Sequence, residues 1–141
     1  MPDLAYTTAV GRRKTATARV KLAPAGKMTV TVNGKPADEF FKTKERQMKT
    51  REVFHIEGVG ETYEVTAHVE GGGVTAQAEA IRMAIARALE KRDATLRKPL
   101  KAAGYLKRDP RSVERKKPGL LKARKRPSWL EARKIRKQLN I

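Results

Sequence analysis

Three neighbouring cations, Arg12, Arg13 and Lys14, follow Gly11 in a stretch that we expect to turn between two strands. Cationic side chains and backbone amides that meet at such a turn donate to phosphate oxygens, which positions a protein on a nucleic acid without selecting its base sequence. From composition alone, an ordinary solvated turn is an equally good interpretation. The turn is the first candidate site for an anion.

A second candidate lies at Gly71, Gly72 and Gly73, directly before a predicted helix. Unpaired amides and the dipole at a helix N-terminus favour an anion there. Neither a Gly-Lys-Ser/Thr sequence nor a G-x-G-x-x-G pattern follows, which argues against a nucleotide-binding enzyme. We expect the glycines mainly to let the chain turn sharply, with close approach of an RNA backbone as a further use.

The third group of cations fills the last quarter of the chain. Residues 105–141 hold 14 basic and 3 acidic side chains, whereas residues 1–70 hold 12 and 9. Pro110, Pro118 and Pro127 break any long helix, and apolar residues are sparse, so in isolation this run is expected to be disordered until a partner orders it. Its candidate RNA-binding side chains are Lys107, Arg108, Arg111, Arg115, Lys116, Lys117, Lys122, Arg124, Lys125 and Arg126.

The whole chain of 141 residues carries 33 Lys and Arg against 15 Asp and Glu, a formal net charge of +18. A charge of this size favours a polyanionic partner, either a nucleic acid or an anionic membrane face. No apolar run approaches the roughly 18 to 20 residues that span a bilayer. The N-terminus also lacks the apolar core of a signal peptide, so we expect a cytoplasmic protein.

The sequence predicts no enzyme, metal site or cofactor. Cysteine is absent, and His55 and His68 fall on separate predicted strands without the spacing of metal ligands. Aromatic residues make up 5% of the chain, which is too few for a platform that stacks single-stranded bases. Recognition of RNA backbone and shape should therefore dominate.

Alternating apolar residues predict the strands that position the first candidate turn. Ala16, Ala18, Val20 and Leu22 share one face of a strand over residues 15–22. Further strands are predicted over residues 28–32, 53–56 and 62–69, with turns at residues 24–26 and 33–34.

Helical patterns complete the expected fold. A short helix is predicted over residues 37–48 and a long one over residues 76–92, where Ile81, Ile85, Ala88 and Leu89 form one apolar stripe. Asp93 can cap a further short helix that Pro99 interrupts and Gly104 ends. The fold class is α+β, a sheet covered on one side by helices.

Three stretches follow one another in a characteristic order, at residues 8–20, 71–89 and 108–126. They read TAVGRRKTATARV, GGGVTAQAEAIRMAIARAL and RDPRSVERKKPGLLKARKR. Together they resemble the S-nine family of small-subunit ribosomal proteins, of the bacterial or organellar type. The resemblance implies a small two-layer α/β sandwich with a left-handed βαβ crossover, as in the second domain of ribosomal protein S-five. It also implies a place in the head of the small subunit.

The same resemblance implies what the chain contacts. Its partners would be small-subunit ribosomal RNA, neighbouring head proteins and transfer RNA in the peptidyl site. The matching RNA-binding positions are Arg12, Arg13 and Lys14, the loop Gly71 to Gly73 and, on the helix that follows, Arg82 and Arg87, followed by a basic tail threaded through RNA. We expect a globular RNA-binding domain over residues 1–104 and the tail over residues 105–127.

Residues 128–141 depart from the family, whose members end soon after the position of Arg126 and Pro127. Ser128 and Glu131 fit a capping box, and the apolar positions that follow gather on one side of a helical wheel. We expect a short basic amphipathic helix that docks on RNA or on a neighbouring protein; an artefactual end is the competing explanation. The nearest matching candidates for contact with transfer RNA are Arg124, Lys125 and Arg126.

Two other classes of protein would fit the charge. One is the protein subunit of an RNA-processing ribonucleoprotein enzyme, for which paired arginines on a basic crossover helix would be expected. Here that helix is mostly alanine, with isolated Arg82 and Arg87. The other is a protein of the membrane surface or one that compacts free nucleic acid, and only the terminal helix supports it.

Overall fold

The computed structural model describes residues 6–139 of the chain. It divides into two compact units, Met1–Pro110 and Arg111–Ile141, called here the folded unit and the tail unit. The folded unit extends through residue 110, and the boundary at residue 104 expected from the sequence stays a prediction. Leu106 packs against the apolar core, and the backbone amide of Tyr105 donates to Leu100 at 3.2 Å.

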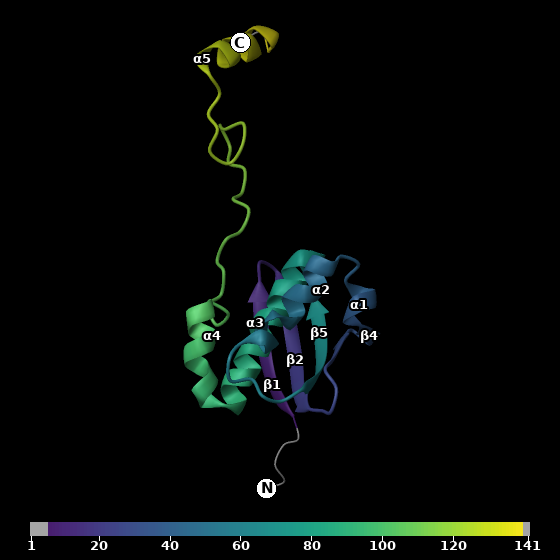
Figure 1. Ribbon diagram of the computed structural model, residues 1–141. Coiled ribbons are helices and arrows are strands. Elements are labelled where there is room, and N and C mark those ends of the chain that lie inside the picture. The colour runs from purple at the N-terminus through teal and green to yellow at the C-terminus, as the bar shows by residue number, and fades with distance from the viewer. Residues whose placement is uncertain (1–5, 140–141) are drawn as a thin grey trace. The chain divides into compact units, whose positions relative to one another are not determined.

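The folded unit is built on one five-stranded sheet with the order β1-β2-β5-β3-β4 (Figure 1). Strands β3 and β5 run parallel, and the other neighbouring strands run antiparallel. The bounds are β1 Thr7–Arg13, β2 Ala16–Pro24, β3 Thr29–Val32, β4 Lys35–Pro36 and β5 Tyr63–Glu70.

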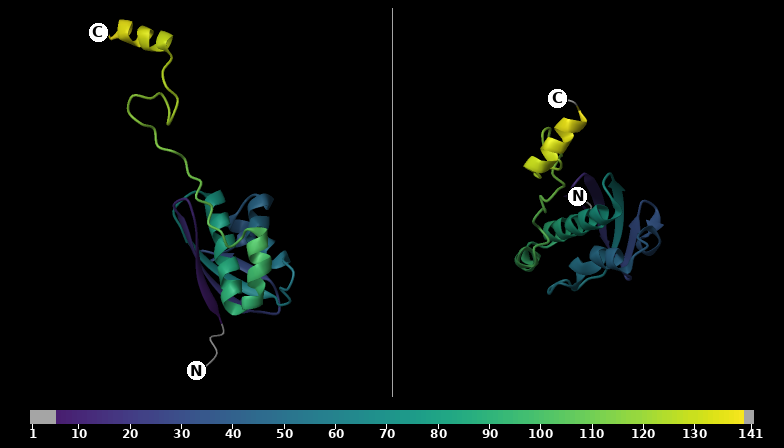
Figure 2. Two further views of the ribbon diagram at one scale, coloured as in Figure 1. Left: turned by 90° about the vertical axis from the view of Figure 1, so that its left-hand side faces the viewer. Right: turned by 90° about the horizontal axis from the view of Figure 1, so that it is seen from above.

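One face of this sheet is buried, as the alternating pattern predicts. On β2, Val20 and Leu22 are buried and Arg19 and Lys21 are exposed, because successive side chains of a strand point to opposite faces. Helix α3 (Val74–Arg92) lies on the buried face (Figure 2). The predicted stripe Ile81, Ile85, Ala88 and Leu89 is wholly buried, and this confirms the α+β class with helices on one side of the sheet.

Gly11 permits the close contact between α3 and β1. It lies inside β1 and not in a turn, and a Cβ atom there would stand 2.1 Å from the carbonyl oxygen of Ala80 and 2.5 Å from the amide nitrogen of Ala84. Both atoms belong to the helix backbone, so they cannot move away without displacing α3. A residue with any side chain at position 11 would therefore push the helix off the sheet.

The connection from β3 to the parallel strand β5 is a βαβ crossover. It passes through β4, α1 (Ala37–Phe40), α2 (Lys44–Arg51) and the 3-10 helix η1 (Glu52–His55). In Figure 1, β5 points upward, α2 lies in front of the sheet, and the chain moves from the β4 side leftward to β5. This is the left-handed sense, whereas about 98% of such crossovers are right-handed.

Two sequence predictions within the crossover are wrong. The single helix expected over residues 37–48 is two helices, because Phe41 takes an extended conformation that buries its ring completely. The strand expected over residues 53–56 is η1, in which Val53 alone turns fully into the core. A short apolar run does not by itself distinguish a strand from one helical turn.

The region after α3 forms two short helices, η2 (Ala94–Leu96) and α4 (Arg97–Ala103). Asp93 caps η2, accepting from the backbone amide of Thr95 at 3.0 Å, and hydrogen bonds from Thr95 lower the pKa of the Asp93 carboxyl. Pro99 does not interrupt the helix as expected. It occupies the first turn of α4, where a backbone N–H would have no partner, and Gly104 ends α4 at a φ of 81°.

The tail unit contains one helix, α5 (Trp129–Gln138), after a segment of turns and bends. The side chains of Glu131, Ala132 and Ile135 lie outside the described residues, so the capping box and the full apolar stripe remain predictions. Among the helices that the structure describes, none combines the length and the hydropathy that crossing a membrane requires.

Candidate nucleic-acid interface

The turn between β1 and β2 presents two of the three predicted cations to solvent. Arg13 pairs with Ala16 across the hairpin, so the turn itself is only Lys14 and Thr15, and Lys14 adopts a positive φ of 52°. Arg12 and Lys14 are exposed. The guanidinium of Arg108 donates to the carbonyl oxygen of Lys14 at 3.3 Å, which brings a third cation to the turn.

Arg13 faces the opposite way, toward α3, and its side chain is only 11% exposed. Its Nε donates to Glu79 at 2.6 Å, and its Nη1 lies 3.4 Å from a carboxylate oxygen of Asp109. Lys49 also pairs with Glu79, at 3.3 Å. The strand alternation that sends Arg12 outward sends Arg13 inward, so Arg13 is held by internal ion pairs.

Glu79 thus lies between two cations. Burial raises the pKa of the Glu79 carboxyl, but hydrogen bonds from Arg13 and Lys49 lower it by more, and the net direction is downward. The carboxylate is therefore ionised at neutral pH. This ion-pair cluster joins β1, α2 and α3 beneath the turn.

The triglycine loop packs against the turn. Gly71 and Gly72 adopt φ values of +73° and +61°. A Cβ atom on Gly71 would stand 2.6 Å from the carbonyl oxygen of Thr15, and one on Gly72 would stand 2.8 Å from the Cβ of Ala16. Gly71 and Gly72 therefore make the predicted sharp turn, whereas Gly73 keeps a negative φ of −97°, and the two candidate anion sites are adjacent.

The first turn of α3 begins immediately after this loop. Gly73 is its N-cap and offers no side chain to the first amides, and the first turn holds no acidic residue. Arg46 from α2 donates to the hydroxyl of Thr75 at 3.1 Å, and the side chain of Gln77 donates to the Gly71 carbonyl at 3.1 Å. Sequence analysis did not select Arg46, because nothing in the spacing of α2 places it near α3.

Arg82 and Arg87, the two predicted cations of α3, have internal partners. Arg82 pairs with Glu52 at 3.2 Å and lies 5.4 Å from the ring centroid of Tyr105. It nevertheless lines one small cavity together with Arg12 and Lys107. Arg87 donates to the carbonyl oxygen of Val10 at 2.8 Å and does not line that cavity.

In the tail unit, described ion pairs converge on Glu114. Its carboxylate binds Lys117 and, at 2.8 Å, the Nε of Arg124. The backbone amide of Leu121 donates to the carbonyl oxygen of Lys125 at 2.9 Å, and Gly119 adopts a φ of 81°. These contacts close a loop over residues 117–125. Its exposed cations are Lys122, Arg124 and Lys125, flanked by Arg115, Lys116 and Arg126.

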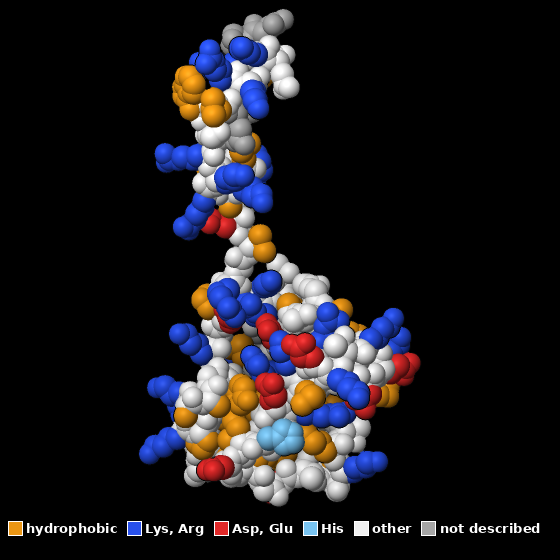
Figure 3. Space-filling view, turned by 45° about the horizontal axis from the view of Figure 1, so that its top comes forward, with side chains coloured by type: hydrophobic (Ala, Val, Ile, Leu, Met, Phe, Trp, Pro, Cys, Tyr) orange, Lys and Arg blue, Asp and Glu red, His pale blue; other side chains and the backbone are white. Residues whose placement is uncertain are grey.

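The two units differ in how far their own carboxylates match their cations. Residues 1–110 hold 21 basic and 13 acidic side chains, and residues 111–141 hold 12 and 2. Figure 3 shows acidic side chains interspersed among the cations of the folded unit and blue Lys and Arg side chains dominating the tail unit. Among the described residues, no cluster of His, Asp and Glu has the arrangement of a metal site.

Known proteins match this chain over most of its length. A family model described as ribosomal protein S9/S16 matches residues 11–132. The small ribosomal subunit protein uS9 of a Synechococcus species is 47% identical over 120 residues, which cover 84% of this chain and 88% of the relative. The protein of the same name from Prochlorococcus marinus has the same identity and coverage. The chain therefore belongs to the ribosomal protein S9/S16 family and is a structural, non-enzymatic component of the ribosome.

Proposed function

We propose that this ribosomal protein works in the small subunit, the assembly named for both relatives, and binds ribosomal RNA there through both of its units. The observation that carries the proposal is the charge of the tail unit, 12 cations against 2 carboxylates. Glu114, one of these two carboxylates, forms ion pairs with two of the cations. The remaining charge requires an external polyanion, and RNA phosphates are the polyanion of the ribosome.

The folded unit contributes one basic end to this interface. Arg12, Lys14 and Arg108 lie together at the β1–β2 turn, and the triglycine loop brings the first turn of α3 beside them. Cations and backbone amides at one place donate to several phosphate oxygens at once. This end positions the protein on an RNA backbone.

The tail unit contributes most of the electrostatic binding. Residues 111–126 contain few apolar side chains, so packing within the segment cannot offset the loss of chain entropy on ordering. Neutralised phosphates supply that free energy through the release of counterions. The loop closed around Glu114 holds several cations on a short stretch of backbone, which lowers the entropy lost on binding.

The finer parts of the proposal are a place in the head of the subunit and an approach to transfer RNA in the peptidyl site. Arg124, Lys125 and Arg126 are the side chains that we assign to the transfer RNA, because they stand at the matching family positions and are exposed. The terminal helix α5 follows them, and its last residues, from 133 onward, lie beyond the family match.

Sedimentation of native particles tests the main proposal. The protein should co-migrate with small subunits after a high-salt wash, and its absence from them would refute the ribosomal RNA interface. Chemical footprinting of assembled subunits with and without residues 128–141 tests the approach to transfer RNA. A peptidyl-site footprint that does not change would remove that role from the end of the chain.

A further inference from the structure

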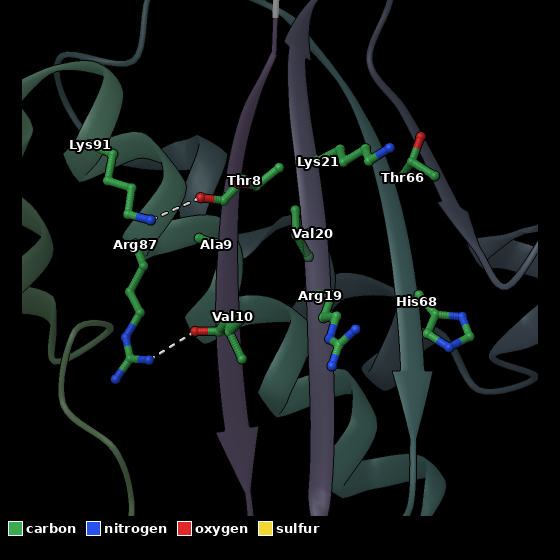
Figure 4. A pocket seen from close by; sticks show the side chains of 10 residues that line it. All are labelled: Thr8, Ala9, Val10, Arg19, Val20, Lys21, Thr66, His68, Arg87 and Lys91. Atoms are coloured by element: carbon green, nitrogen blue, oxygen red, sulfur yellow. Dashed lines mark hydrogen bonds between the residues drawn. The ribbon is translucent and has the colours of Figure 1, made fainter.

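The helix-free face of the sheet contains a broad hollow that begins one row of strand partners away from Arg12 at the basic end. Its volume is about 850 Å³, and it lies over β1, β2 and β5 (Figure 4). The ten residues that line it include no Asp or Glu and four cations, Arg19, Lys21, Arg87 and Lys91. Arg12 is exposed on the same face of β1, but the residues that line the hollow have no part in the function proposed above.

Strand register arranges the hollow in two neighbouring rows. In one row, Val10 pairs with Arg19 and Arg19 pairs with His68; in the other, Thr8 pairs with Lys21 and Lys21 with Thr66. The rows are two residues apart, or about 6.8 Å along an antiparallel strand. Each row therefore places one β2 cation between an uncharged β1 residue and a β5 residue.

Helix α3 adds a second cation to each row at the open edge of β1. Arg87 reaches around the edge to donate to the Val10 carbonyl at 2.8 Å, and Lys91 donates to the Thr8 carbonyl at 3.0 Å. Figure 4 shows both side chains extended toward β1. These bonds satisfy backbone groups that an edge strand leaves unpaired, and they also hold two charged groups at the rim.

Carboxylates are present on this face only outside the hollow. Glu70, on the exposed side of β5, accepts from His68 at 2.8 Å; this hydrogen bond and, to a smaller degree, the charge of the nearby Arg19 lower the pKa of the Glu70 carboxyl. Glu64 is exposed nearer the other end of β5. The positive potential is therefore concentrated over β1 and β2, between two acidic positions that limit its extent.

We propose that this hollow is a second RNA-binding site, in which a strand of ribosomal RNA lies across β1 and β2. Phosphates meet the two rows of cations, and sugars or bases cover Val10 and the hydroxyl-bearing side chains of Thr8 and Thr66. The site rests on the proposed ribosomal RNA binding but involves none of the residues at the basic end or in the tail unit. The occupant is inferred from charge: four cations and no carboxylate among the lining side chains favour an anionic partner, and RNA phosphates are the polyanion of the ribosome.

A crosslinking experiment identifies the occupant directly. The chain contains no cysteine, so Thr66→Cys creates a unique attachment point at an exposed, uncharged position in the hollow. A photoreactive group attached there, in full-length protein assembled into small subunits, should crosslink to ribosomal RNA. Crosslinks to a neighbouring protein, or none at all, would overturn the proposal.

A binding titration measures the contribution of the central cations. The double substitution Arg19→Gln and Lys21→Gln should reduce the slope of log affinity against log salt by roughly 1.5 for binding to small-subunit ribosomal RNA. Lys98→Gln with Lys101→Gln is the matched control, because it removes two exposed charges from α4 on the helix-covered side of the sheet. If both double variants lower the salt slope by the same amount, the effect comes from total charge and the proposal of a second site is wrong.

The two failures are distinguishable. If the unaltered protein does not bind the RNA, the proposed function itself fails. If it binds normally while Arg19→Gln with Lys21→Gln behaves like the control, only the second site fails.

Discussion

The folded unit and the tail unit are both basic, but they neutralise their cations differently. In the folded unit, ion pairs such as Arg13 with Glu79 and Arg82 with Glu52 connect elements that are distant in sequence. In the tail unit, the described pairs share one carboxylate, Glu114. The arginines of the first group connect elements of the folded unit, and those of the tail unit are the ones that we propose for RNA binding. Counting charges alone therefore does not separate cations that are paired within the protein from cations that we propose for RNA binding; the carboxylates near each cation must be counted as well.

The largest expected effect tests the tail half of this comparison. Replacing eight tail cations with glutamine, while keeping the chain length, should lower the magnitude of the salt slope of RNA binding by about 6 to 7. Affinity near physiological salt should fall about a thousandfold, or about 4 kcal/mol. The eight are Arg111, Arg115, Lys116, Lys117, Lys122, Arg124, Lys125 and Arg126. Filter-binding titrations measure both quantities, and a change in slope of only about 2 would contradict the assignment.

The second effect tests whether the folded unit depends on its own packing. Gly11→Ala should lower the free energy of unfolding by about 3 kcal/mol, because the new methyl group collides with the backbone of α3. Gly26→Ala is the control, since open space surrounds that position. Urea denaturation followed by circular dichroism provides the measurement. Equal stability of the two variants would show that α3 can move away from β1.

The third effect tests the internal ion-pair cluster. Glu79→Gln should lower the free energy of unfolding at pH 7 by about 2 kcal/mol, because Arg13 then lacks its main charged partner. The folded pKa of Glu79 is depressed, so its stabilisation is present above the unfolded value of about 4.3 and is lost as the pH falls through the folded pKa. The difference between variant and unaltered protein should therefore shrink on acidification.

A matched substitution distinguishes a buried pair from a surface pair. Asp38→Asn breaks an ion pair with Arg51 in which the carboxylate side chain is 62% exposed, and it should leave the unfolding transition at pH 7 unchanged. If it destabilises the protein as much as Glu79→Gln does, burial is not what distinguishes the Glu79 cluster.

The smallest effect tests whether the folded unit also contacts RNA. Arg12→Gln with Lys14→Gln should reduce the salt slope by roughly 1.5 and the affinity about tenfold, without a change in thermal unfolding. Arg13→Gln should do the reverse, lowering stability while leaving the slope nearly unchanged, because its guanidinium is turned inward. If substitution of Arg13 lowers the salt slope of RNA binding as much as substitution of Arg12 and Lys14 does, the inward-facing and outward-facing arginines do not differ in RNA binding.

Several features follow from the sequence by itself. The basic excess of the last quarter, the strand alternation of residues 15–22 and 62–69, and the stripe on α3 are local patterns, and each predicts its structure directly. The three ordered stretches indicate the family. The resemblance to the family implies the left-handed crossover, which the periodicity of apolar residues does not predict. Local patterns succeed because the period of a strand or helix depends only on the backbone geometry.

The tertiary structure alone decides what each cation does. Extending the strand pattern of β1 through Arg13 would have placed that residue on the buried face with Ala9 and Gly11, but the partner Glu79 lies 66 residues away. The reach of Arg87 and Lys91 to the edge of β1 likewise joins residues 77 and 83 positions apart. Such contacts depend on which elements pack together. A sequence shows how many charges a chain carries, and only the packing shows which of them the protein has already neutralised.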